Sequence, residues 1–108
     1  MALAIFNYSD AQAGQTLAAA QPDRIIRVER LIITSWVGVA ITLVSDPGGV
    51  GEAAISATLR YSPGGLGVFE FPKPYALTTE RGRALGLNTS FQSSAGNYGV
   101  MVWYEYVQ

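Results

Sequence analysis

The sequence predicts an all-β domain built as a sandwich or barrel. Strand-like segments recur at short intervals between Gly and Pro residues, and no stretch has a convincing 3.6-residue apolar period flanked by helix caps. The 108 residues have the usual length of a single domain and contain no internal repeat or long linker. Seven or eight short strands in such a chain are typical of these two architectures.

The N-terminal third contains the first three predicted strands. Residues 4–8 form the first, and a short strand is expected at residues 16–20, although the Ala-rich stretch 14–21 would also suit a turn of helix. The strand at residues 24–35 changes its apolar phase midway, because Ile26 and Val28 share one face while Leu31 and Ile33 fall on the other. A β-bulge near Arg30 would reconcile the two halves.

The central part of the chain continues the same pattern. Residues 39–44 alternate, with Val39, Ile41 and Leu43 as the core face, and a type II turn is expected at Pro47-Gly48 because Gly accepts a positive φ. Further strands are predicted at 53–61, 65–71 and 83–91. Breaks are expected at 62–65 and 71–74.

The last strand, residues 97–107, is apolar and aromatic on both faces. In a two-layer sandwich each sheet has one outward face, so this pattern favours an interface between subunits, whose cores are enriched in aromatic residues. The face at this interface is either Tyr98, Val102, Tyr104 and Tyr106, or the opposite set of Met101, Trp103 and Val107. Sequence alone leaves both open.

Composition excludes several classes of function. Charged residues make up only 14% of the chain, which suggests that other subunits cover part of its surface. A net charge of -1 without a basic cluster argues against nucleic-acid and anionic-membrane partners. The chain has no Cys and no His, so thiolate sites, the commonest general base and the commonest transition-metal ligand are missing.

The remaining motifs indicate neither a catalytic site nor a cofactor. Two Gly-rich stretches, 48–51 and 64–67, are interpreted as turns because neither opens a helix. Asp46 and Glu52 make a weak calcium site, because calcium needs several oxygen ligands. Glu70, Glu80 and Glu105 offer only a chance pairing of an acid with a base. Aromatic residues including Trp36 and Trp103 would instead stack on sugars in a carbohydrate-binding alternative.

Taken in order, several segments resemble small jelly-roll virion proteins of tailed bacteriophages, the decoration or cement proteins of heads and related fibre modules. The similar pattern covers residues 24–108. It consists of 27–35 leading into 40–43, a Gly-flanked strand ending at Phe71-Pro72, the stretch 78–88 and the closing strand 96–105.

The resemblance implies a jelly-roll-like antiparallel β-sandwich of about eight strands in a non-enzymatic capsid decoration protein. Such a protein forms homotrimers and binds the major capsid protein, which stabilises the head against internal pressure. Residues 1–21 would be an N-terminal arm or the first strand, and residues 22–108 the sandwich. Without a basic N-terminus and a long apolar stretch, the chain is expected to be made and assembled in a cytoplasm. The resemblance implies that this is the host cytoplasm and that the protein resides in the virion. A host-sugar-binding tail or fibre module and a generic β-sandwich interaction domain remain the alternatives.

Overall fold

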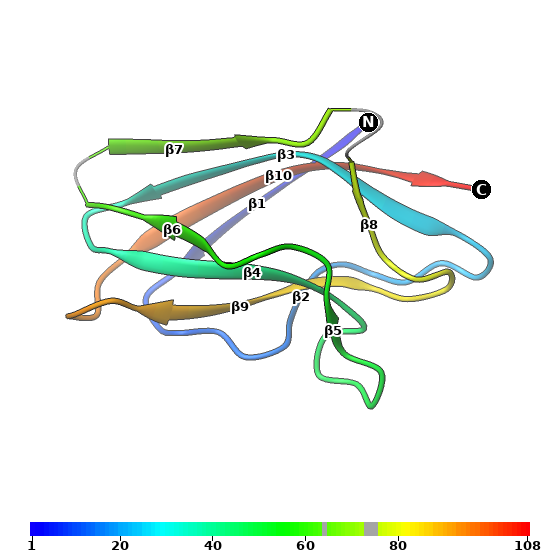
Figure 1. The fold of residues 1–108 in the computed structure, drawn as a ribbon, viewed down its shortest axis with the longest axis horizontal. Helices are drawn as coiled ribbons and strands as arrows, with labels where there is room; N and C mark the ends of the chain where they lie inside the picture. The colour runs from blue at the N-terminus through cyan, green and yellow to red at the C-terminus, as the bar shows by residue number, and fades with distance from the viewer. Residues whose placement is uncertain (64, 73–75) are drawn as a thin grey trace.

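The chain folds as an antiparallel β-sandwich of two packed sheets (Figure 1), as predicted. The structure is a computed structural model and describes residues 1–63, 65–72 and 76–108. Residue 64, in the predicted break at 62–65, and residues 73–75, which include the end of the predicted break at 71–74, lie outside the described residues. The strands are β1 Ala2–Tyr8, β2 Gln15–Ala18, β3 Ile25–Ser35, β4 Val39–Ser45, β5 Ala53–Ala54, β6 Leu59–Tyr61, β7 Gly65–Glu70, β8 Leu77–Thr78, β9 Leu85–Phe91 and β10 Tyr98–Val107.

The strand order is that of a jelly roll. Sheet A has the order β1-β10-β3-β7, with β8 also paired to β3, and sheet B has the order β2-β9-β4-β5, with β6 also paired to β4. The first half of the chain therefore pairs with the second half in reverse: β1 with β10, β2 with β9, β3 with β7 and β8, and β4 with β5 and β6. Successive pairs alternate between the two sheets, which is the double Greek-key arrangement of this fold.

The ten strands found in the described residues occupy eight positions, which accounts for the predicted number. β7 and β8 lie one after the other along β3, and β5 and β6 lie one after the other along β4. The predicted single strand 53–61 is therefore wrong. The middle of this segment does not pair with β4 through its backbone. There the backbone N–H of Leu43 donates to the side-chain Oγ of Ser56 at 3.0 Å, which replaces a main-chain hydrogen bond between strands.

The core lies between the sheets and follows the alternation of each strand. Val39, Ile41 and Leu43 are fully buried, as predicted for β4, and they face the buried Val100 and Val102 of β10 within one continuous core cluster. The phase change in β3 is also confirmed, because Ile26, Val28, Leu31 and Ile33 are all fully buried. The register with β10 shifts between Trp103, opposite Arg30, and Tyr104, opposite Val28, so Glu29 is the extra residue of a bulge.

The N-terminal segment contributes an edge strand to each sheet. Among the described strands, β1 pairs with β10 alone at one edge of sheet A, and β2 pairs with β9 alone at one edge of sheet B. The helical alternative for residues 14–21 is wrong, since β2 occupies this stretch. Between the two strands, Gln12 N–H donates to Thr89 Oγ1 at 2.7 Å, which fastens the connecting loop to β9.

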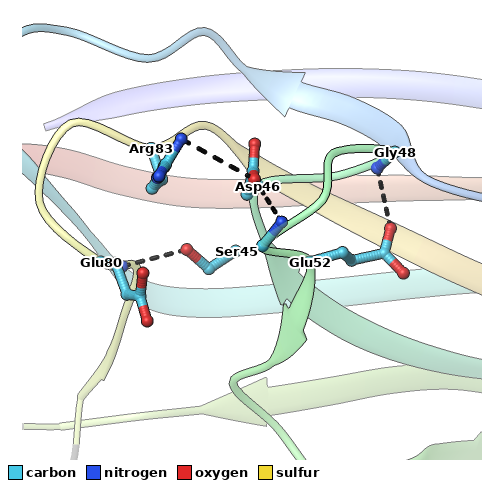
Figure 2. A network of polar contacts seen from close by, with 7 residues as sticks. Ser45, Asp46, Gly48, Glu52, Glu80 and Arg83 are labelled. Carbon is cyan, nitrogen blue, oxygen red and sulfur yellow. Dashed lines mark hydrogen bonds and ion pairs between the residues drawn. The ribbon is translucent and has the colours of Figure 1, made fainter.

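The loop after β4 is held by its own carboxylates (Figure 2). Pro47 and Gly48 form the expected turn, with φ of +72° at Gly48 and a 3.0 Å hydrogen bond from Gly49 N–H to the Asp46 carbonyl. Asp46 Oδ2 accepts from Gly51 N–H at 3.1 Å, and Glu52 Oε1 accepts from Gly48 N–H at 2.8 Å. The buried hydroxyl of Ser45 accepts from the N–H of Glu80. These bonds order the loop against the β8–β9 connection.

Candidate functional site

The outer face of sheet A carries an uninterrupted apolar row. Ile5 of β1 lies opposite Met101 of β10, Met101 lies opposite Ile32 of β3, and Ile32 lies opposite Val68 of β7. Directly paired residues project from the same face of a sheet. Because Leu31 and Ile33 are buried in the core, this row points away from it.

A second row lies beside the first and is half apolar. It runs from Leu3 of β1 through Trp103 of β10 to Arg30 of β3 and Glu70 of β7. The Arg30 guanidinium lies 5.4 Å from the Trp103 ring centroid and pairs with Glu70 at 2.5 Å. We call the six apolar residues of the two rows the apolar band: Leu3, Ile5, Ile32, Val68, Met101 and Trp103.

The predicted interface residues divide between the two faces of β10. Tyr98 and Val102 are 2% and 0% exposed and belong to the core, so neither side chain is available to a second subunit. Tyr104 and Tyr106 also pack against the core, and the Tyr106 hydroxyl donates to the carbonyl of Ala19 at 2.6 Å. The opposite predicted set, Met101, Trp103 and Val107, alternates with these core residues along β10 and lies on the outer face.

Four members of the apolar band were not anticipated from the sequence. Leu3 and Ile5 alternate with Ala4 and Phe6, whose side chains pack on the core, so β1 is apolar on both faces as β10 is. The same two-sided signal was available for Ile32, which lies between two core residues. Val68 carried no such signal, because its outward direction depends on the pairing of β7 with β3.

A groove opens at the end of this face, next to the apolar band. It has a volume of about 790 Å³ and is lined by residues of β1, β3, β10 and the adjoining loops. Its floor includes Gly99, which lies between Asn7 and Thr34 in the sheet register. Trp36, in the loop after β3, lies at the side of the groove and is 85% exposed.

Two tyrosines support the groove from beneath. Tyr98 donates to the carbonyl of Asp10 at 2.8 Å and lies 2.7 Å from Thr89 Oγ1, which accepts from Gln12 N–H. Burial raises the pKa of Tyr98 above its ordinary value. Tyr8 packs against Tyr98 with ring centroids 5.6 Å apart, and its pKa is raised by burial and then by the neighbouring Tyr98. Within the described residues the Tyr8 hydroxyl is buried without a hydrogen-bond partner.

Four of the five carboxylates considered as metal ligands or acid–base groups have partners within the chain. Asp46 and Glu52 bind backbone N–H groups of their own loop, and Arg83 Nη1 lies 3.9 Å from Asp46 Oδ2 (Figure 2). Glu70 pairs with Arg30, and Glu105 pairs with Arg27. Across residues 1–63, 65–72 and 76–108, no three acidic side chains come together as a metal site.

The predicted aromatic platform for sugars does not form as one surface. Trp36 follows Ser35, which lies opposite Tyr98, whereas Trp103 is five residues further along β10, roughly 17 Å away at the rise of a strand. The two indoles therefore belong to separate surfaces. Trp36 lies at the groove, and Trp103 lies in the apolar band.

In the part of the chain that the structure describes, no helix is long and apolar enough to cross a membrane. Comparison with models of protein families, with curated proteins and with solved structures gives no match for this chain.

Proposed function

We propose that this chain is a non-enzymatic structural protein that associates with copies of itself through the apolar band. The observation that carries the proposal is the apolar row that crosses four strands on the outside of sheet A. Ile5 is 61% exposed, and Leu3 and Val68 are each 47% exposed. Monomeric proteins rarely expose a large contiguous apolar patch, and such patches mark contact surfaces.

The size of the face fits a stable interface. The molecule measures 40 by 28 by 21 Å, so the flat side of the sandwich is about 40 by 28 Å. A specific interface buries ~800 Å² per partner, which this side accommodates. Each Å² of apolar surface removed from water contributes about 25 cal/mol, and this gain opposes the losses of association.

The chemistry of the face favours a second copy of the chain as its occupant. The charges in the two rows, Arg30 and Glu70, already neutralise each other, so these two rows present no net charge to be matched by a partner. The neighbouring edge strand β1 contains no charged residue and no Pro. Edge strands of proteins that stay monomeric are usually protected by such residues. Both features suit self-association.

We place this assembly on a virus head, as a decoration protein that forms homotrimers and binds the major capsid protein. The resemblance of residues 24–108 to small virion proteins supports this assignment, and the jelly-roll strand order is the fold that the resemblance implies. Once the apolar band is covered between copies, the remaining exterior of each subunit is free to contact the coat lattice. Such contacts between coat subunits would stabilise the head.

The test of this assignment is the composition of purified virions of the phage that encodes the chain. We expect many copies per head by quantitative mass spectrometry, and heads that lack the chain should release their genome at a lower temperature. A chain that is absent from virions, or whose removal leaves the heat resistance of heads unchanged, would contradict the decoration role.

A further inference from the structure

We infer that the groove beside Trp36 is a binding site for a neutral saccharide. The inference rests on the groove alone and is independent of the proposed self-association. Three features carry it: a hollow made by a glycine, unpaired polar groups around the hollow, and an exposed indole at its side.

The hollow exists because position 99 has no side chain. A Cβ placed on Gly99 would lie 2.9 Å from Thr34 Oγ1 and 3.2 Å from Asn7 Oδ1. The two polar atoms therefore converge above the backbone of β10 from the strands on either side. A glycine in a strand interior leaves room for the close approach of a ligand.

The polar groups around the hollow are available for a ligand. No hydrogen bond of the Asn7 amide, the Thr34 hydroxyl or the Asn97 amide to another described residue is found, and all three residues are exposed. Together they provide donors and acceptors without a formal charge. A few convergent polar groups in a concave site fix the orientation of a small ligand.

The indole of Trp36 supplies the apolar part of the site. An 85% exposed Trp at the start of the loop between β3 and β4 has no role in the core, and leaving it in water is unfavourable. A pyranose ring has one face of C–H groups that packs on an aromatic ring, and its hydroxyls match amides and hydroxyls at the edge. The groove combines both kinds of contact.

The charge of the groove selects the ligand class. None of the nine described residues that line it is charged. Phosphates, nucleotides and carboxylated sugars are bound by Arg, Lys or a metal ion, and none of the lining residues is an Arg or a Lys. The volume of about 790 Å³ falls within the ~300–1,000 Å³ of small-molecule sites. A neutral mono- or oligosaccharide fits these limits.

The experiment is a binding screen of the full chain on an array of immobilised neutral oligosaccharides of glucose, galactose, mannose and N-acetylglucosamine. The best binder is then titrated in solution, with tryptophan fluorescence recorded in the Trp103→Phe variant, in which Trp36 is the only indole. We expect saturable quenching. Trp36→Ala should weaken binding at least tenfold on the array.

Two further variants separate the groove from other surfaces. Gly99→Ala fills the hollow. Its two tight contacts are movable side-chain ends and the Phe6 carbonyl lies 3.7 Å away, so the fold should persist; we expect at least a tenfold loss of binding. Trp103→Ala changes the apolar band and should leave sugar binding unchanged while reducing self-association. Absence of binding to every neutral oligosaccharide, or binding that survives Trp36→Ala and Gly99→Ala, would overturn the inference without affecting the proposed assembly.

Discussion

The Arg30 guanidinium lies over the indole of Trp103, 5.4 Å from the ring centroid, while it also pairs with Glu70 at 2.5 Å. Both partners of Arg30 lie in its own row on the outer face of sheet A. The cation therefore stays in contact with the apolar band but presents little free charge to a neighbouring subunit. This arrangement keeps the band compatible with burial, because a buried cation without a partner would be costly.

The two contacts of Arg30 can be separated by mutation. The ion pair is solvent-exposed, with side-chain exposures of 45% and 58%, so Glu70→Gln should change the free energy of unfolding by less than about 1 kcal/mol. The cation–π contact is worth about 0.5–1 kcal/mol at an exposed site. A double-mutant cycle of Arg30→Ala with Trp103→Ala, measured by urea unfolding at low protein concentration, should give a coupling of that size. Zero coupling would contradict the contact.

Removing the hydroxyl should change the free energy of unfolding differently at Tyr98 and at Tyr8, whose rings pack against each other. Tyr98 binds the carbonyl of Asp10 and lies at hydrogen-bond distance from Thr89, so Tyr98→Phe should lower the free energy of unfolding by about 1–3 kcal/mol. The Tyr8 hydroxyl is buried and unpaired within the described residues, so Tyr8→Phe should leave stability unchanged or raise it by up to about 1 kcal/mol. Urea unfolding of both variants gives the comparison. A larger loss for Tyr8→Phe than for Tyr98→Phe would be evidence against the hydrogen-bond chain.

The free energy of unfolding should fall in alkaline solution, because folding raises the pKa values of Tyr98 and Tyr8. Burial raises the pKa of Tyr98 above the 10.0 of an unfolded tyrosine, and burial followed by the neighbouring Tyr98 does the same for Tyr8. The folded state then holds these protons more tightly, so the contribution is complete below pH 10 and is lost as pH rises through the folded pKa values. Thermal melting from pH 8 to pH 11 should show a decline above pH 10. The decline should be smaller in Tyr8→Phe, and an equal decline would refute the assignment.

Gly86, the glycine of β9, is predicted to tolerate a side chain poorly. A Cβ there would lie 2.3 Å from Pro47 Cβ and 2.6 Å from the carbonyl oxygen of Gln15, so Gly86→Ala must displace the loop after β4 or strand β2. Such overpacking costs about 1–3 kcal/mol. Gly82→Ala is the comparison, because nothing lies within 4 Å of its Cβ and only its φ of +76° opposes the change. Urea unfolding should show the greater loss for Gly86→Ala.

Much of the fold could be predicted because each strand carries its own pattern. The alternation of β4 and the phase change of β3 at Glu29 are local signals, and both were visible in the sequence. The interruption between β5 and β6 was not, since it depends on a side-chain bond from Ser56 to the backbone of β4. Local pattern gives no information on such a contact.

The candidate surfaces were less accessible to sequence reasoning. β10 is apolar on both faces, so the pattern named Trp103 and Met101 together with residues that belong to the core. Only the pairing with β3 shows which set points outward. The groove was not predicted because Asn7, Thr34 and Gly99 are far apart in the chain and meet through strand register alone.

The central claim is that the apolar band is an interface between copies of this chain, and its direct test is the solution mass by light scattering over a range of concentrations. We expect a stable trimer for the unchanged chain. The double variant Ile5→Lys, Val68→Lys should be monomeric, whereas the control Val50→Lys should remain trimeric, because Val50 is fully exposed in the loop after β4 and outside the apolar band. A chain that is monomeric at every concentration, or a double variant that remains trimeric, would contradict the claim.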